Sequence, residues 1–315
     1  MPSLQARLIR TFSRRVIRRE GLDGPQLVRH LRRVFNRPPP ISFLPRGTAV
    51  SQINRSGFCG EHIARRRGRQ QGPVILYVHG GAYIAGTTRT YHGLAGRLAK
   101  YLDAQVYLVQ YPFAPENPFP SAVEKVIEAY QFLLGEGHAP ENLVVAGDSA
   151  GGGLSLALML ALKDRGLPLP AGAALFSPGG SCTLGSYVYS NSDSDVMLSA
   201  DMIQRVVEVY VQDPSQYEHR YASPAHADLS GLPPLLITAE RSECLYGDAL
   251  DIRWRAEEAG IELTWIEREG LFHVWPIMVP FLPEARQDLK QVVAFIRQCV
   301  GDAVSSADAG EAGLA

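Results

Sequence analysis

The chain has little of what a disulfide-stabilised or membrane-spanning protein needs. Its 315 residues include only four cysteines, Cys59, Cys182, Cys244 and Cys299, and their spacing matches no metal or redox motif. Reduced thiols in the cytoplasm are the simplest interpretation. No run approaches the ~20 apolar residues that a transmembrane helix requires. The N-terminal residues are not expected to form a secretory signal either, because no apolar segment follows Arg14-Arg15.

The chain also lacks a strong net charge. Its formal charge is −1, so nothing attracts it globally to nucleic acid, and no nucleic-acid partner is predicted. Hydrophobic residues make up 46% of the chain, enough for the core of one large domain or two small ones. The charge is unevenly placed, because residues 1–40 hold ten arginines against Glu20 and Asp23.

This arginine-rich region carries two amphipathic helical patterns. Apolar residues recur at near-helical spacing from Leu4 to Ile17 and again from Leu27 to Phe35, and Pro38-Pro39-Pro40 ends the second pattern. Three roles are open: a cap over an active site, weak contact with an anionic membrane surface, or binding of a partner. We rank the cap first and the membrane second.

From Val50 onward, short apolar strands alternate with helical patterns, which predicts a mostly parallel sheet with helices on both faces. No internal repeat is present. The tail 301–315 has no apolar periodicity and is predicted to be disordered. The predicted strands are Val74–Val78, Leu143–Ala146, Ala173–Ser177, Leu235–Ala239 and Glu262–Ile266, and the predicted helices are Tyr91–Leu102, Ser121–Leu134, Ser149–Asp164, Gly247–Ala259 and Glu284–Val300.

The segment Gly147-Asp148-Ser149-Ala150-Gly151 lies between an apolar strand and an apolar helix. This is the context of a nucleophile elbow, in which a sharp turn exposes a serine at the start of a helix. The flanking glycines permit that turn because they have no Cβ. Ser149 is therefore the candidate nucleophile. An ordinary strand-to-helix turn explains the five residues equally well when they are taken alone.

A second loop strengthens this interpretation. His79-Gly80-Gly81-Ala82-Tyr83 directly follows the predicted strand Val74–Val78. Acyl transfer places negative charge on a carbonyl oxygen, which needs fixed hydrogen-bond donors. The N–H groups of Gly80 and Gly81, together with that of Ala150, are the predicted donors. His79, Tyr83 and Asp148 are predicted to line or support the substrate pocket.

Together these motifs resemble the hormone-sensitive-lipase-like branch of the α/β-hydrolases, the bacterial esterase type. The resemblance covers roughly residues 45–300 and includes Tyr111-Pro112-Phe113-Ala114-Pro115-Glu116-Asn117-Pro118-Phe119-Pro120. It implies an α/β-hydrolase fold with a helical cap. The expected divisions are N-terminal cap helices (1–45), a catalytic domain (46–300) and a cap insertion (178–225). Ala82 departs from the third glycine that is frequent in the family.

The remaining catalytic residues follow from chain order, which in this fold is serine, acid, histidine. His273 follows the last predicted strand and matches the family's Gly-x-x-His pattern, so it is the predicted general base. His219 and His226 come too early for this role. The family usually has an aspartate where this chain has Ser242.

Neighbouring carboxylates are the candidates for the acid that Ser242 does not supply. We favour Glu243, because its extra methylene restores the reach. Asp248 is the alternative, although it is expected in the first turn of a helix, where acids favour the helix dipole. Glu240 lies close to the end of the preceding strand and comes too early.

The sequence therefore predicts a cofactor-free, metal-free serine carboxylesterase that acts on short- to medium-chain esters of small molecules. A non-catalytic ligand-binding homologue stays open, because loss of the aspartate is how a catalytic triad begins to decay. Deacetylase, amidase and lactonase activities also stay open, since they share the same oxyanion chemistry. The resemblance allows a homodimer without specifying the residues of its interface.

Overall fold

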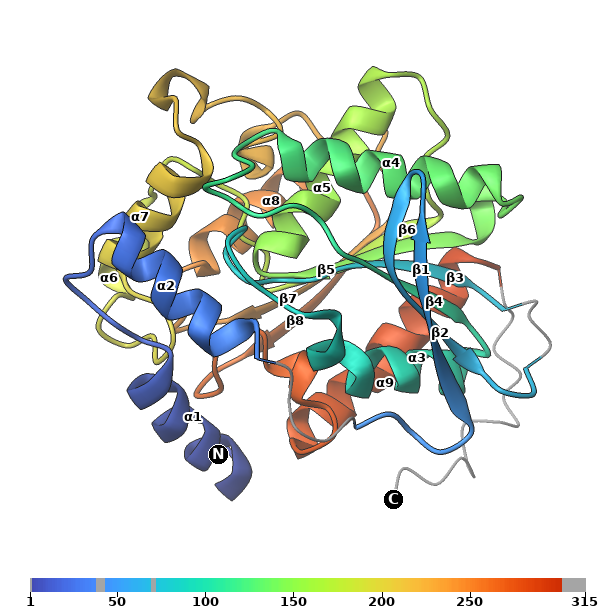
Figure 1. Ribbon diagram of the computed structural model, residues 1–315, viewed down its shortest axis with the longest axis horizontal. Coiled ribbons are helices and arrows are strands. Elements are labelled where there is room, and N and C mark those ends of the chain that lie inside the picture. The colour runs from blue at the N-terminus through green and yellow to red at the C-terminus, as the bar shows by residue number, and fades with distance from the viewer. Residues whose placement is uncertain (1, 38–42, 69–71, 302–315) are drawn as a thin grey trace.

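The computed structural model describes residues 2–37, 43–68 and 72–301, which contain one eight-stranded sheet (Figure 1). The order across the sheet is β1-β2-β4-β3-β5-β6-β7-β8. From β4 to β8 neighbouring strands are parallel, whereas β2 is antiparallel to both of its neighbours. The predicted mostly parallel sheet is confirmed. The strands are β1 (Thr48–Arg55), β2 (Phe58–Arg65), β3 (Val74–Val78), β4 (Gln105–Val109), β5 (Leu143–Asp148), β6 (Gly172–Phe176), β7 (Leu235–Glu240) and β8 (Leu263–Arg268).

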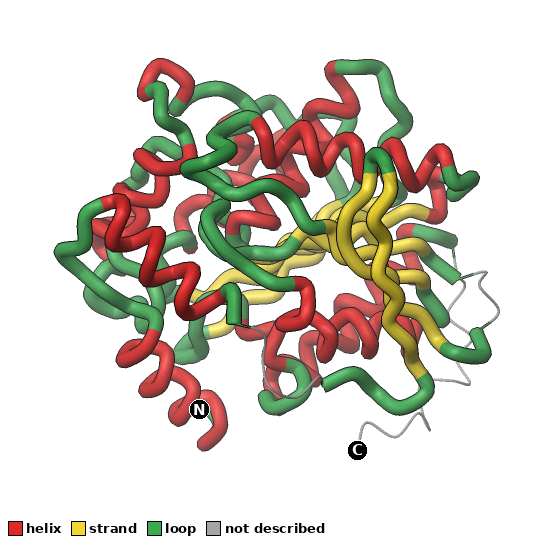
Figure 2. Tube along the Cα trace, viewed as in Figure 1, coloured by secondary structure: helices red, strands yellow, loops and turns green. Residues whose placement is uncertain are grey.

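Helices cover both faces of this sheet (Figure 2). Within the described ranges they are α1 (Leu4–Val16), α2 (Gly24–Phe35), α3 (His92–Leu102), α4 (Ser121–Gly135), α5 (Ala150–Asp164), α6 (Ser186–Ser190), α7 (Ala200–Tyr210), α8 (Tyr246–Glu258) and α9 (Pro283–Cys299). Short 3₁₀ turns are η1 (Thr88–Tyr91), η2 (Pro140–Asn142), η3 (Pro214–Gln216), η4 (Pro224–His226) and η5 (Trp275–Met278). No helix in this part of the chain is long and apolar enough to cross a membrane.

Side chains along the central strands point alternately to the two faces of the sheet, so the protein has a hydrophobic core on each face. Val74 and Leu76 of β3 pack on the side of α4 and α5, whereas Ile75 and Tyr77 pack on the side of α3 and α9. All five residues of β3 are buried, as expected for a parallel strand covered on both faces. The central strands are therefore packed against helices on both faces of the sheet.

The predicted strands and helices are confirmed to within two residues at each end. The strands that the sequence did not predict are β1, β2 and β4. β1 lies at the edge of the sheet and is mostly exposed, so it lacks the apolar pattern of a buried strand.

Helix α2 lies beside α7 at the left of Figure 1, and α1 lies below α2 in that view. Ala6 of α1 shares an apolar cluster with Leu271 and Phe272. The Ser3 side chain caps α1, and Asp23 begins α2 with a reciprocal capping box to Gln26. Leu27 and Leu31 of α2 share an apolar cluster with Met202 of α7. The predicted stop at Pro38-Pro39-Pro40 and residues 302–315 of the predicted tail lie outside the described residues.

Candidate active site

Ser149 occupies a sharp turn between β5 and α5, as the elbow pattern predicts. Its backbone has φ +52° and ψ −124°, an unusual conformation for a residue with a side chain. The flanking glycines have no room for a Cβ. One at Gly147 would lie 2.4 Å from the Gly151 carbonyl oxygen, and one at Gly151 would lie 2.0 Å from that of Val78. The Ser149 N–H donates to the Phe176 carbonyl oxygen at 2.9 Å, which ties the turn to β6.

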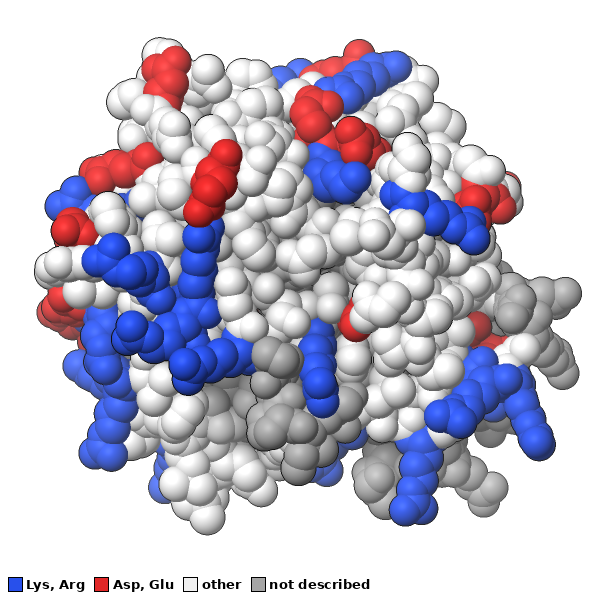
Figure 3. Space-filling model, viewed as in Figure 1, with Lys and Arg blue, Asp and Glu red and all other residues white. Residues whose placement is uncertain are grey.

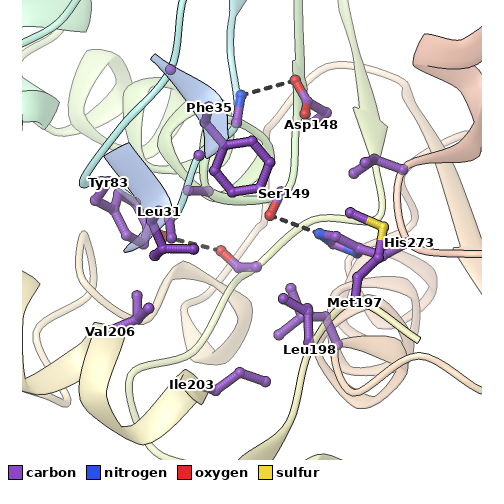
Figure 4. A pocket seen from close by; sticks show the side chains of 18 of the residues that line it. Leu31, Phe35, Tyr83, Asp148, Ser149, Met197, Leu198, Ile203, Val206 and His273 are labelled. Carbon is purple, nitrogen blue, oxygen red and sulfur yellow. Dashed lines mark hydrogen bonds between the residues drawn. The ribbon is translucent and has the colours of Figure 1, made fainter. Parts of the chain in front are cut away.

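His273 reaches this serine from the loop after β8. Its Nε2 lies 2.8 Å from Ser149 Oγ (Figure 4). Its Nδ1 lies 2.6 Å from Glu243 Oε2. The loop is fixed beside the ring because the Val274 N–H donates to Ser177 Oγ at 3.2 Å. Both partners are almost completely buried, with His273 3% and Glu243 1% exposed. Three residues that are far apart in the sequence therefore form one continuous hydrogen-bonded row.

Of the three candidate carboxylates, Glu243 is the one that contacts the imidazole. Its other oxygen, Oε1, accepts the Glu240 N–H at 3.0 Å, which fixes the carboxylate plane. Glu240 instead accepts the Gly270 N–H at 2.7 Å and hydrogen bonds from Ser242. The structure therefore brings Glu243 to the site and keeps Glu240 away from the ring.

Asp248, the alternative candidate for the acid, binds backbone N–H groups and not the imidazole. Its Oδ2 accepts the N–H groups of Gly180 and Ser181 at 2.7 and 3.0 Å. Burial raises the pKa of this carboxyl to about 7, against the lowering effect of those two hydrogen bonds. Asp248 therefore holds the loop after β6 and does not touch His273.

The surroundings of His273 favour its protonated form. Burial works to lower the pKa of the imidazole, whereas the hydrogen bond and charge of Glu243 work to raise it. The charges of Asp195 and Asp148 act in the same direction, and the pKa is raised above its ordinary value. An imidazolium that forms next to Ser149 is therefore stabilised by the protein.

The predicted oxyanion donors need one correction. The Gly80 N–H donates to Asp148 Oδ1 at 2.9 Å and to the Tyr91 hydroxyl at 3.1 Å, so the expectation that it faces the oxyanion is wrong. Within residues 2–37, 43–68 and 72–301, the N–H groups of Gly81, Ala82 and Ala150 have no acceptor. These three residues line the same cavity as Ser149. Sequence reasoning missed Ala82, whose backbone is left-handed with φ +58°.

Asp148 fixes the loop that carries two of these free N–H groups. Its carboxylate accepts the Gly80 N–H and the hydroxyls of Tyr77 and Tyr91, at 2.9 to 3.1 Å. Burial raises its pKa to about 6 despite those hydrogen bonds. Asp148 borders the cavity as predicted, but its polar atoms are occupied by the protein.

The other two predicted pocket residues, Tyr83 and His79, differ in their position relative to the cavity. Tyr83 lines the cavity, with its ring stacked on Tyr210 at a centroid distance of 3.8 Å. His79 is not among the residues that line the cavity, so of its two expected roles only support of the pocket is left. Its ring stacks on Tyr111, its Nδ1 lies 2.7 Å from the Gly80 carbonyl oxygen, and burial lowers its pKa to about 4. His79 therefore supports the loop from behind as a neutral side chain.

The cavity above Ser149 has a volume of about 160 Å³ and mostly apolar walls (Figure 4). The N-terminal region contributes Ile17, Leu31 and Phe35 to these walls. The segment before and within α7 contributes a larger apolar set: Met197, Leu198, Met202, Ile203, Val206, Val207 and Tyr210. Both regions that the sequence assigned to a cap thus contact the space next to the serine.

The loop of residues 191–198 is hydrogen-bonded to the turn that carries Glu243, residues 240–244, which we call the acid turn. Asn191 Nδ2 donates to the carbonyl oxygens of residues 241 and 243 at 3.0 and 2.9 Å. Ser194 Oγ donates to the Ser242 carbonyl oxygen at 3.0 Å, and Asp195 Oδ2 accepts the Cys244 N–H at 2.8 Å. The backbone on either side of Glu243 is therefore held by side chains of the 191–198 loop.

Arg18 in turn holds the 191–198 loop. Its guanidinium donates to the carbonyl oxygens of Ser192 at 2.6 Å, of Asp195, and of Leu198 at 3.2 Å. It also pairs with Glu20. The segment after α1 is thus linked through this loop to the carboxylate that contacts His273.

In the described part of the chain, no group of three or more His, Cys, Asp or Glu side chains is placed to hold a metal ion.

Comparisons with known proteins agree on one family. The model of a family described as "alpha/beta hydrolase fold" matches residues 75–277. An acetyl-hydrolase of Streptomyces hygroscopicus is 39% identical over 81% of this chain and 85% of its own length. An esterase of Acinetobacter venetianus is 33% identical over 84% of each chain.

Solved structures give the same result. An esterase from the bacterial hormone-sensitive lipase family has a TM-score of 0.85 and 30% identity, covering 96% of this chain and all of its own. The esterase EstE5, in crystals soaked by p-nitrophenyl butyrate, has a TM-score of 0.84 and 31% identity. That match covers 95% of this chain and 99% of EstE5. The predicted fold and family are therefore confirmed.

Proposed function

We propose a catalytic mechanism for this chain, which belongs to the α/β-hydrolase family and is a hormone-sensitive-lipase-like esterase, a serine hydrolase of carboxylic esters. In this mechanism Ser149 is the nucleophile, His273 is the general base and acid, and Glu243 is the acid of the triad. The observation that carries it is the row from Ser149 Oγ to His273 Nε2 at 2.8 Å and from His273 Nδ1 to Glu243 Oε2 at 2.6 Å.

The acylation step forms a bond between Ser149 Oγ and the ester carbonyl carbon. His273 Nε2 takes the hydroxyl proton, and Glu243 stabilises the imidazolium without itself being protonated. The carbonyl oxygen becomes an oxyanion, and in this mechanism the free N–H groups of Gly81, Ala82 and Ala150 donate hydrogen bonds to it. Collapse breaks the ester C–O bond, and His273 returns its proton to the leaving alcohol.

Deacylation repeats these steps with water in place of the serine. His273 accepts a proton from the water, which attacks the acyl-enzyme carbonyl carbon. The second tetrahedral intermediate collapses, the carboxylic acid leaves, and the proton returns to Ser149 Oγ. The residues used are the same in both halves, so no further cofactor enters the reaction.

The substrates that fit this site are esters of short or medium acyl chains. The cavity next to Ser149 measures about 160 Å³, a size that in general admits a molecule as large as benzene. Its walls are mostly apolar. The name acetyl-hydrolase of one relative, and the p-nitrophenyl butyrate soak of EstE5, favour the same size class.

Hydrolysis of p-nitrophenyl esters of increasing acyl length by the purified protein tests this proposal. We expect kcat/KM to be highest for short or medium chains, and Ser149→Ala to abolish turnover. An organophosphate should label the wild type and leave Ser149→Ala unlabelled. No turnover of any ester and no labelling of Ser149 would instead support a non-catalytic ligand-binding protein. Turnover of acetylated amines or lactones, with none of the esters, would move the activity to a deacetylase, amidase or lactonase.

A further inference from the structure

Helix α1 exposes three large apolar side chains in a row. Leu4 is 69% exposed, and Leu8 and Phe12 are each 63% exposed. Their spacing of four residues puts them on one side of the helix. In the described ranges, no other large apolar side chain is as exposed as these three. Ala6 and Ser13 on the opposite side are buried, so the helix is held against the protein while this ridge faces outward.

Arginines flank the ridge. Arg7, Arg14 and Arg15 are exposed and form no ion pair within residues 2–37, 43–68 and 72–301. Residues 1–19 contain no aspartate or glutamate. Figure 3 shows blue side chains gathered over α2 and beside α1, on the side of the molecule that also carries α7.

Beside α1 lies a groove of about 400 Å³ with a basic wall. Arg7, Arg10 and Arg14, one helical turn apart, line it with Thr11, and Val196 and Gly270 are among the residues opposite. The Arg10 guanidinium donates to the Leu271 carbonyl oxygen, whereas the guanidinium groups of Arg7 and Arg14 have no acceptor among the described residues. The groove thus offers two free guanidinium groups to an anion such as a phosphate.

From these three features we propose that α1 docks the protein on an anionic lipid surface. Leu4, Leu8 and Phe12 enter the apolar boundary of the bilayer, and the flanking arginines bind the headgroup phosphates. A helix with apolar and basic faces lies in the plane of the interface in this way. The cavity above Ser149 is lined by Ile17, directly after α1, so docking brings that side of the enzyme toward the lipid.

A second copy of the chain is the competing occupant, and the charges disfavour it. A twofold interface pairs the same patch with itself, which would bring the arginines of one α1 close to those of the other. The cores of protein interfaces are also depleted of charged residues. An anionic bilayer supplies the opposite charge over the same area.

Vesicle sedimentation of the full chain tests the proposal, with vesicles of phosphatidylcholine alone or mixed with phosphatidylglycerol. We expect binding to the mixed vesicles that weakens as salt is added, and little binding to the neutral ones. The variant L4Q/L8Q/F12Q should lose most of this binding. The variant R7Q/R14Q should weaken it by roughly fivefold for each arginine removed.

Two matched controls carry the same chemical changes elsewhere. Trp254→Gln removes an exposed apolar side chain from α8, and R46Q/R67Q removes two exposed arginines near the β1–β2 hairpin. Both should bind as the wild type does, and all variants should keep their esterase activity in free solution. Equal binding to neutral vesicles, or full binding by L4Q/L8Q/F12Q, would overturn the proposal. So would a dimer in size-exclusion chromatography that this variant converts to a monomer, because the ridge would then bind a second copy.

Discussion

The serine side and the acid side of the site are held in place by different kinds of contact. On the serine side, the turn at Ser149 depends on glycines that leave room for neighbouring backbone, at Gly147 and Gly151. On the acid side, Glu243 sits in a turn whose backbone is held by side chains of Asn191, Ser194 and Asp195. The first kind of support is built into the strand and helix, and the second comes from the separate loop of residues 191–198.

Two buried aspartates show the same contrast. Asp148 and Asp195 are each 2% exposed. Asp148 is adjacent to the serine and accepts two tyrosine hydroxyls and the Gly80 N–H. Asp195 lies in the 191–198 loop and accepts three backbone N–H groups, one of which belongs to the acid turn. The serine side is therefore fixed by the sheet, whereas the position of the acid depends on how the 191–198 loop is packed.

Of the substitutions that test this contrast, we expect the largest loss of kcat from a change of Glu243 itself. Glu243→Gln keeps the shape of the side chain but removes the charge that stabilises the His273 imidazolium, so kcat should fall by roughly 10³-fold or more. The matched variant Asp248→Asn changes a buried carboxylate that does not touch the ring, and it should cost little in kcat. Steady-state hydrolysis of a p-nitrophenyl ester measures both. A larger loss in Asp248→Asn than in Glu243→Gln would reassign the acid.

A smaller effect is expected from the loop that holds the acid turn. Asn191→Ala removes both hydrogen bonds to the carbonyl oxygens of residues 241 and 243. We expect an unfolding free energy lower by about 1–3 kcal/mol. We expect kcat to fall by roughly tenfold, equivalent to about 1.4 kcal/mol of transition-state stabilisation. KM should change little, because Asn191 does not line the cavity.

Asn142→Ala is the control that distinguishes a role of Asn191 in positioning Glu243 from a general loss of stability. Its side chain donates to the Gly72 carbonyl oxygen at 3.1 Å, far along the chain from the acid turn. Thermal unfolding and kcat, measured on both variants, give the comparison. If the two variants lose stability and kcat in the same proportion, Asn191 is a structural residue with no special link to Glu243.

The same contrast explains what the sequence could predict. Ser149 and the elements around it follow from a five-residue motif between an apolar strand and an apolar helix. His273 follows from chain order, and Glu243 from its place next to Ser242. Asn191 and Asp195 could not be found, because they act from an irregular segment whose partners are separated from it by about 50 residues in the sequence.

The error at Gly80 has a similar cause. In the sheet, Val78 of β3 pairs with Gly147 of β5, which puts Asp148 opposite the start of the loop that carries Gly80. The Gly80 N–H is used by that carboxylate, and Ala82 has a free N–H in its place. The motif alone gives the spacing of the loop residues but not the neighbouring strand, so it could not show which N–H groups are free.

The smallest expected effect is a change in the pH dependence of the reaction. His273 must be neutral to accept the serine proton, so activity is present above its pKa and is lost as the pH falls through it. Burial lowers this pKa, but Glu243, Asp195 and Asp148 raise it above 6.5, so the acid limb of kcat/KM should have its midpoint above pH 6.5. Asp195→Asn removes one of the negative charges and should move the midpoint to lower pH, by less than Glu243→Gln does. Because Asp195 also holds the acid turn, its variant should in addition lower the plateau at high pH. A lowered plateau with an unchanged midpoint would mean that Asp195 acts on Glu243 through the backbone alone and not through its charge.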